Sequence, residues 1–346
     1  MFSDKSYINC DDPVIHIIYP SLMANLVEER GVTKRQLFFN AKLDVGLLDN
    51  SKSRISLREF IQLVLTALDL TGDPTLGLHY GSRLNIASSG YLSTALMSCA
   101  TLGDALVLCM KYYPANGVSM DIAFERHGNF VHAICPLLKQ LPSSAQRFML
   151  EAWLTAWRIH SCSLLQRELT FTELQLVYPE PSYVDLYRDF FACEIKFEAK
   201  TNTAIYLLEY LKEPLPTAND LILKICEQQC DELLAEIKAL ESLAGRVADL
   251  LLNWDGNHPS VENIAQALKL SPRALAKRLS DQGTSYQSIF NDVRRQRALQ
   301  YIRSGDLSIE TIAEKLGFSD ASNFRKAFKR WTGLPPSYFR SRETAV

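Results

Sequence analysis

The sequence predicts a mixed α+β domain followed by an all-α domain that contains two helix-turn-helix motifs. Three observations support this fold class. Helical and strand-like apolar spacing alternate over residues 1–216, a two-helix pattern occurs twice after residue 243, and the two parts carry opposite net charge. The chain has 346 residues, of which 47% are hydrophobic and 22% are charged. This composition is sufficient for two domains and excludes a disordered or fibrous chain.

The first domain, residues 1–216, is predicted to combine helices with a few short strands. Apolar side chains recur every three or four residues in four segments, which predicts helices over 14–30, 56–70, 102–113 and 143–165. A two-residue period predicts strands at 120–124 and 130–135, joined by a turn at His127-Gly128-Asn129, and at 174–178 and 194–197. One more helix is predicted between the last two strands, over 183–190.

An amphipathic helix over 217–242 is predicted to connect the two domains. Its apolar residues, such as Leu221, Ile225 and Leu233, alternate with charged ones. Two interpretations are open, because the apolar stripe can pack within its own domain or pair with a second subunit in a homodimer. The second domain, residues 243–346, begins with a helix near 243–254.

Charge is distributed unequally along the chain. The formal net charge at pH 7 is −2, and a value near neutrality argues against nucleic-acid binding. Residues 251–346, however, contain 15 Lys or Arg and 9 Asp or Glu, a net charge of +6, whereas residues 1–250 carry −8. Such asymmetry is typical of a chain in which one part binds nucleic acid.

Two segments of the second domain, 260–281 and 308–331, repeat one pattern. In each, a Ser that can cap a helix (Ser260 or Ser308) precedes apolar residues at i, i+3, i+4 and i+7, and a tight turn leads into a second helix. This pattern predicts two helix-turn-helix motifs, separated by a helix over 286–303. Held on one face, the two second helices would reach successive major-groove segments about one turn, roughly 34 Å, apart.

The outward faces of both second helices are basic. The first carries Arg273, Lys277 and Arg278, and the second carries Arg325, Lys326, Lys329 and Arg330. A helix that enters the major groove needs side chains that contact base edges, with others around them that bind phosphate. A solvated charged face would explain either helix alone, but the repetition favours double-stranded DNA as the partner.

An ordered run of residues in the second motif is specific to one protein family. The run contains Ile312-Ala313-Glu314, Gly317-Phe318-Ser319-Asp320, residues 324–333 and residues 335–340. In these residues the domain resembles the DNA-binding domain of the AraC/XylS family of bacterial transcription regulators. The resemblance implies seven helices with two helix-turn-helix motifs, and an activator that works with RNA polymerase.

The resemblance also implies roles for individual side chains, by their position in the motif. Base contacts are implied for Arg273, Lys277, Ser322, Arg325 and Lys326, and we expect phosphate contacts from Arg278, Lys329 and Arg330. Ala276 and Ala321 also fall where that family meets bases, but a methyl group offers only apolar contact, for example to thymine.

The first domain is similar to the arabinose-binding-type effector domain of a subgroup of that family. The matching pieces are Gly90-Tyr91-Leu92, the segment 101–106 and the stretch 190–216. The resemblance implies a small-molecule effector, since similar proteins sense amino acids, amines or fatty-acid-like molecules. Polar aromatic residues suit the lining of an apolar pocket, so we take Tyr91, Tyr112, His132 and Trp157 as candidates for effector binding.

Two other function classes compete with this interpretation, an effector-modifying enzyme and a thiol redox sensor. Cys135-Pro136 and the six histidines form no recognisable triad, and the Pro-Cys-His-Arg sequence of methyl-accepting repair proteins is absent. Cys226 and Cys230 are four residues apart on the connecting helix and could oxidise, but they lack the third ligand of a metal site. We therefore expect no catalytic residue, no metal and no cofactor.

The cysteine pattern and the N-terminus predict a soluble, cytoplasmic protein. Eight cysteines occur without a CxxC pair, mostly in apolar segments, as expected for reduced and buried thiols. The first residues lack the basic start and apolar stretch of a signal peptide. The uncharged segment 84–103 is interrupted by polar residues and glycine, which makes it a poor membrane span.

Overall fold

The computed structural model describes residues 12–84, 86, 90–112, 122–135, 141–240, 242–252, 254, 259–304, 307–332 and 335–336. The chain divides into two compact units, an N-terminal unit of Cys10–Leu240 and a C-terminal unit that includes Glu241–Val346. The described part of the first combines helices with two sheets and that of the second is helical, which confirms the predicted fold class. Within the described residues, no helix is long and apolar enough to cross a membrane.

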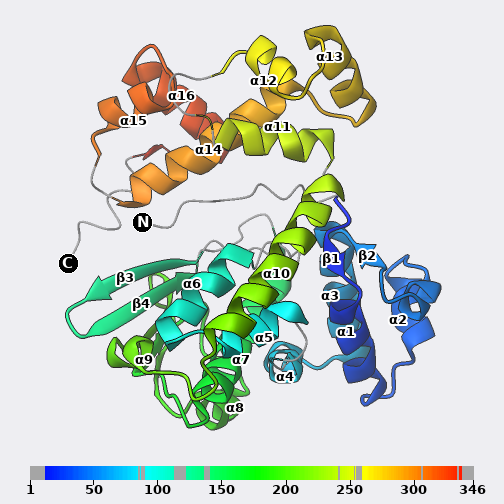
Figure 1. The fold of residues 1–346 in the computed structure, drawn as a ribbon, viewed down its shortest axis with the longest axis vertical. Coiled ribbons are helices and arrows are strands. Elements are labelled where there is room, and N and C mark those ends of the chain that lie inside the picture. The colour runs from blue at the N-terminus through cyan, green and yellow to red at the C-terminus, as the bar shows by residue number, and fades with distance from the viewer. Residues whose placement is uncertain are drawn as a thin grey trace. The chain divides into compact units, whose positions relative to one another are not determined.

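Helices account for most of the N-terminal unit (Figure 1). They are α1 (Ile18–Glu28), α2 (Lys34–Asn40), α3 (Leu57–Thr71), α4 (Leu76–Arg83), α5 (Tyr91–Met97), α6 (Leu102–Tyr112), α7 (Ser143–Leu165), α8 (Val184–Phe191), α9 (Glu209–Lys212) and α10 (Asp220–Leu240), with the 3-10 helix η1 (Val45–Asp49). A capping box starts α3, because the Ser56 hydroxyl accepts a hydrogen bond from the Glu59 N–H and the Glu59 carboxylate accepts one from the Ser56 N–H. Helix α7 has the predicted bounds.

A five-stranded sheet, in the order β3-β4-β7-β5-β6, forms the other part of this unit. Its strands are β3 (Ala123–His127), β4 (Phe130–Cys135), β5 (Glu173–Gln175), β6 (Glu194–Lys196) and β7 (Asn202–Leu207). The central strand β7 is antiparallel to β4 and β5, while β5 and β6 are parallel. The sequence did not predict β7, because it is buried almost throughout and lacks the alternation of a half-exposed strand.

The start of the unit and the hairpin also differ from the prediction. The first helix begins at Ile18 rather than at residue 14, because β1 (Ile15–His16) pairs with β2 (Arg54–Ile55). The β3–β4 turn is shorter than expected, since His127 pairs with Phe130. The end of the predicted helix at residue 113, and the first residues of the strand predicted at 120–124, lie outside the described residues.

The main core of the N-terminal unit lies between the sheet and α7. Val131 and Ala204, from β4 and β7, pack with Leu150 and Leu154 of α7. Helix α4 crosses α7 at Gly77 and Gly81. A Cβ atom at Gly77 would lie 2.4 Å from Glu151 Oε2, and one at Gly81 would lie 2.4 Å from the Ala152 carbonyl oxygen. The two glycines therefore permit the close approach of the helices.

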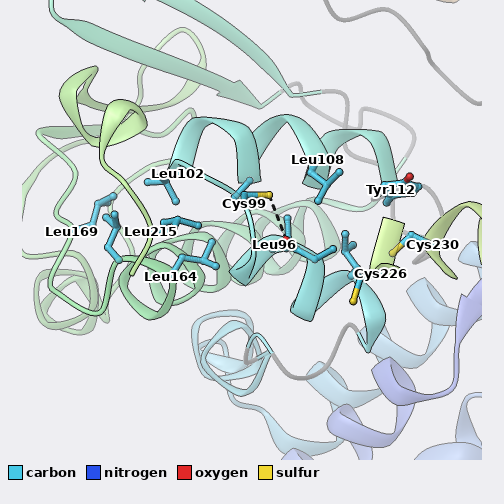
Figure 2. Packing of buried hydrophobic residues seen from close by; sticks show 14 residues of the cluster. Leu96, Cys99, Leu102, Leu108, Tyr112, Leu164, Leu169, Leu215, Cys226 and Cys230 are labelled. Atoms are coloured by element: carbon cyan, nitrogen blue, oxygen red, sulfur yellow. Dashed lines mark hydrogen bonds between the residues drawn. The ribbon is translucent and has the colours of Figure 1, made fainter. Parts of the chain in front are cut away.

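Helix α10 packs along α5 and α6 in the same unit (Figure 1). Cys226 and Cys230 of α10 are buried in a cluster with Leu96, Leu108 and Tyr112 (Figure 2). Three large apolar side chains near its N-terminal end remain exposed, by 69%, 41% and 57% for Leu221, Ile222 and Ile225. One apolar stripe of the connecting helix thus packs within its own unit, and a second stripe faces solvent.

The C-terminal unit contains two separate hydrophobic cores joined by one helix. Its elements are α11 (Leu243–Leu252), α12 (Val261–Ala267), α13 (Pro272–Asp281), α14 (Tyr286–Ser304), α15 (Ile309–Lys315) and α16 (Ala321–Thr332). The first core joins α11, α12 and α13, and the second joins α15 and α16. Helix α14 runs between them (Figure 1) and contributes Ile289 and Val293 to the first core, and Ala298 and Ile302 to the second. Both predicted helix-turn-helix motifs are present.

In the turn of each motif one residue adopts a left-handed conformation, and the type of that residue differs between the two motifs. The φ angle is +67° at Gly317 in the second motif and +56° at Lys269 in the first. Glycine adopts this conformation without strain, whereas a side chain opposes it. The helix predicted near 243–254 ends at Leu252, and Trp254 lies outside it.

Candidate nucleic-acid interface and effector site

Helix α13 presents a buried and a basic face. Its first turn is capped by Ser271, whose hydroxyl accepts a hydrogen bond from the Ala274 N–H, and Pro272 occupies the first helical position. Leu275 and Leu279 are buried in the first core. The side chains predicted to contact DNA from this helix are all exposed: Arg273, Lys277 and Arg278.

Helix α16 repeats this arrangement with a stronger cap. The Asp320 carboxylate accepts a hydrogen bond of 2.7 Å from the Asn323 N–H, and this bond holds the pKa of the Asp320 carboxyl below its usual value. Phe324 and Phe328 are buried in the second core. The predicted DNA-contacting side chains of this helix are also exposed: Ser322, Arg325, Lys326, Lys329 and Arg330. Residues 333–334 and 337–340, which belong to the family-specific run, lie outside the described residues.

One predicted base-contacting residue has a partner that the sequence did not reveal. The Arg325 guanidinium lies 3.1 Å from the Glu310 carboxylate of α15, and both side chains are more than half exposed. An exposed ion pair of this kind contributes little to stability. In this structure the pair directs the Arg325 side chain toward α15.

The two basic faces offer the chemistry that duplex DNA requires. Arginine forms two parallel hydrogen bonds to the guanine edge in the major groove, while lysine and arginine bind phosphate oxygens. The exposed Ser322 hydroxyl can donate to or accept from a base edge. Ala276 is exposed and Ala321 half-buried, so the methyl group of Ala276 is the more accessible.

The four candidate effector residues lie on four different elements. Tyr91 is 58% exposed on α5. Tyr112 is buried at the end of α6, where its hydroxyl donates to the Asp231 carboxylate of α10 at 2.7 Å. Trp157 of α7 packs against the rings of Phe124 and Tyr206, at centroid distances of 5.5 and 5.3 Å.

His132 lies on the other face of the sheet from Trp157. Its neighbours Val131 and Ala133 point into the core that contains Trp157, so by strand alternation the His132 side chain points away. It contacts the His127 ring at a centroid distance of 4.3 Å, and burial holds the pKa of His132 below its ordinary value, with a smaller contribution from His127. The structure therefore does not bring these four side chains to one surface.

A buried polar network, which the sequence did not reveal, joins α7 and α8. The Glu151 carboxylate of α7 accepts hydrogen bonds from the hydroxyls of Tyr183, at 2.8 Å, and Tyr187, at 2.5 Å. The Tyr187 hydroxyl also lies 2.8 Å from that of Tyr178, whose ring packs against the Arg147 guanidinium. Among the described residues, Glu151 Oε2 is buried without a hydrogen-bond partner.

Burial dominates the titration of this network. It raises the pKa of the Glu151 carboxyl to about 7, although the Tyr187 and Tyr183 hydroxyls and the Arg147 guanidinium favour the ionised form. The same burial, together with the Glu151 charge, raises the pKa of Tyr187 far above its ordinary value. Only the identity of residue 151, a Glu inside an apolar helix stripe, signals the network in the sequence.

The three cysteines considered for chemistry, Cys135, Cys226 and Cys230, lack the features of reactive thiols. Cys226 and Cys230 are 6% and 3% exposed, and burial raises the pKa of Cys230 to about 11. Burial likewise raises the pKa of Cys135 to about 12. Reactive cysteines are accessible and have a lowered pKa, so this environment disfavours a thiol sensor. Pro136 lies outside the described residues.

No group of three or more His, Cys, Asp or Glu within the described part of the chain is arranged to hold a metal ion.

Comparison with known proteins decides the family. Residues 31–215 match the model of the arabinose-binding domain of AraC transcription regulators, and residues 264–342 match a helix-turn-helix domain. The chain is 35% identical to the ornithine utilization regulator of Pseudomonas aeruginosa, in an alignment that covers 97% of this chain and 99% of that protein. The chain belongs to the AraC family of transcription regulators.

Further relatives of this regulator share its length. It is 25% identical to an uncharacterized HTH-type transcriptional regulator of Mycobacterium tuberculosis, over 95% of this chain and 97% of that protein. Among solved structures it is similar to the crystal structure of the transcriptional regulator CdpR from Pseudomonas aeruginosa, with 24% identity, a TM-score of 0.43 and coverage of 94% and 98% of the two chains. The matched helix-turn-helix domain and the alignment with the Pseudomonas aeruginosa ornithine utilization regulator show that the chain is a DNA-binding transcription regulator.

Proposed function

We propose that this regulator is a transcription activator rather than an enzyme, and that a small organic effector bound in its N-terminal domain controls it. In this proposal it binds a specific operator as a homodimer and contacts RNA polymerase. The observation that carries the DNA-binding part of the proposal is the pair of capped helices, α13 and α16, whose outward faces are basic and exposed within one helical unit. Two such helices can occupy neighbouring segments of the major groove.

Individual side chains have distinct roles in this proposal. Five exposed side chains of the two recognition helices read bases, namely Arg273, Lys277, Ser322, Arg325 and Lys326. Three others bind phosphate, namely Arg278, Lys329 and Arg330. Removing a base contact changes the preferred sequence, whereas removing a phosphate contact weakens binding to all sequences alike.

The N-terminal domain, residues 1–216, is proposed to bind the effector, and residues 217–242 to connect it to the DNA-binding domain at 243–346. One relative aligned over nearly the whole chain, at 35% identity, is an ornithine utilization regulator, so amino acids and amines of that size are the first effectors to test. The exposed apolar residues of α10 support a role in dimerisation, because burying them against a second subunit would remove apolar surface from water.

The test combines native mass spectrometry with DNA selection on the full chain. Native mass spectrometry of the purified protein is expected to show a dimer and a copurified small molecule. Selection from a random pool of double-stranded DNA is expected to enrich one sequence, and ornithine or a related amine is expected to change the affinity for it. If no sequence is enriched, the proposed sequence-specific binding is wrong. If a reporter promoter carrying the selected site is repressed in the presence of the effector, the proposed activation is wrong.

A further inference from the structure

Arg294, in the middle of α14, connects the two hydrophobic cores of the C-terminal unit. Its guanidinium carbon lies 4.4 Å from the ring centroid of Phe290 and 4.4 Å from that of Phe318. Phe290 packs on the first core and Phe318 on the second. The guanidinium is therefore held between one aromatic ring from each helix-turn-helix half.

A hydrogen bond orients this contact toward the turn of the second motif. Arg294 Nη2 donates to the Gly317 carbonyl oxygen at 2.7 Å, inside the turn that sets the direction of α16. The side chain is half-buried, and burial lowers the pKa of its guanidinium. A cation removed from water and placed on ring faces interacts more strongly than an exposed one.

The contact continues on both sides of Arg294 as a series of packed rings. Tyr286 stacks on Phe290 with an interplanar angle of 11°, one helical turn earlier on α14. Phe318 packs against Phe324 and Trp331 of α16, at centroid distances of 5.6 and 5.8 Å. Tyr286 in turn donates to the Pro259 carbonyl oxygen, just before α12. A continuous path of side-chain contacts thus runs from the start of the first motif to the recognition helix of the second.

We propose that Arg294 is a positioning residue that fixes the separation of the two recognition helices, so that the regulator accepts DNA sites with one spacing between the two contacted segments. This inference rests on the proposed readout of DNA by both α13 and α16. The apolar contacts that α14 makes with the two cores would by themselves permit sliding and rotation. The planar guanidinium of Arg294 stacks between two rings and donates a hydrogen bond in its own plane. These directional contacts specify one position of the second motif relative to the first.

The test measures spacing, which a loss of general stability would not change. Full-length protein is used to select sites from a random pool of double-stranded DNA, and affinity is then measured on the selected site and on versions lengthened or shortened by one base pair between its two segments. Wild type is expected to lose about tenfold or more in affinity on either altered site, because one base pair rotates and shifts the second segment relative to the first.

Arg294→Met retains the length and apolar volume of the side chain but removes the charge and the donors. We expect it to enrich the same two segments at more than one spacing, and to bind the altered sites within about threefold of the original. Arg294→Lys, which keeps the charge without the planar group, is expected to restore part of the discrimination. Phe318→Leu removes the ring on the second motif and should relax the spacing in the same way.

Arg295→Met is the matched control, because it removes the same charge from the next residue of α14, whose ion pair with Asp292 lies within the helix. It is expected to retain the wild-type spacing. The inference is overturned if Arg294→Met discriminates spacing as wild type does. It is also overturned if that variant binds all sites more weakly by the same factor and the slope of log affinity against log salt concentration falls by the amount expected for one phosphate contact. That result would mean that Arg294 contacts a DNA phosphate instead of setting the spacing. A wild type that selects no second segment would contradict the proposed two-helix readout itself.

Discussion

The buried carboxyl of Glu151 should make the stability of the N-terminal unit depend on pH in a defined direction. Its pKa is about 7 in the folded unit, against an ordinary value of 4.5. The folded unit therefore binds a proton more tightly than the unfolded chain, so the free energy of unfolding falls as pH rises from about 4.5 to about 7. At about 1.4 kcal/mol for each pH unit of difference, the ionised carboxyl costs about 3 kcal/mol above pH 7.

Glu151→Gln removes this cost while keeping an oxygen that can accept from Tyr183 and Tyr187. We expect variant and wild type to be similarly stable near pH 5, where the carboxyl is largely protonated in the folded unit. Near pH 8 the variant should be more stable by about 3 kcal/mol. Burial lowers the pKa of His16, His79 and His132, which produces the opposite trend, but both proteins share it.

The assay is urea unfolding of the full chain at several pH values between 5 and 8. Trp153 and Trp157 lie on α7 beside Glu151, so their fluorescence reports this unit in a Trp254→Phe/Trp331→Phe background. Glu180→Gln, at an exposed carboxyl of the same unit, is the control. A stability difference between Glu151→Gln and wild type that stays constant from pH 5 to pH 8 would refute the reasoning.

Three further predictions test the helix contacts and the recognition helix. Gly81→Ala should destabilise the N-terminal unit by about 2–3 kcal/mol in urea unfolding, because its Cβ would overlap the Ala152 carbonyl oxygen; an unchanged midpoint would contradict the close α4–α7 contact. Lys269→Gly should stabilise the C-terminal unit by about 1 kcal/mol in thermal unfolding, since it relieves the left-handed conformation, and a loss of stability would count against this account. Arg325→Ala should weaken binding to the selected operator by about 1–3 kcal/mol and relax preference at one base pair, and an unaltered sequence preference would remove Arg325 from the base-reading set.

The C-terminal unit was predictable from sequence because its signals are local. Ser260, Ser271 and Ser308 cap helices at the positions where their spacing to the apolar residues predicted them. The buried residues follow the same helical period that the sequence shows, and a helix of seven to twelve residues needs no distant partner to define its inward face.

The sheet and the polar network of the N-terminal unit depend on residues far apart in the chain. β7 pairs with β4, about 70 residues earlier, and no local pattern encodes that pairing. The prediction of the four effector residues rests on their side-chain chemistry, which does not determine on which side of a strand or helix a side chain lies. His132 shows this, because its position on β4 directs it away from the core that contains Trp157.

Glu151 and Arg294 illustrate one physical limit of reading polar residues from sequence. A single charged residue in a helix is normally solvent-exposed, because burying a charge is costly unless other groups compensate. In both cases aromatic residues elsewhere in the fold supply part of the compensation. The hydroxyls of Tyr183 and Tyr187 donate to the Glu151 carboxylate, and the ring of Phe318 packs against the Arg294 guanidinium. Each contact therefore exists only when two separate elements are correctly placed. Because such a group is costly when its partners move away, it favours one arrangement of those elements over others that apolar packing alone would tolerate.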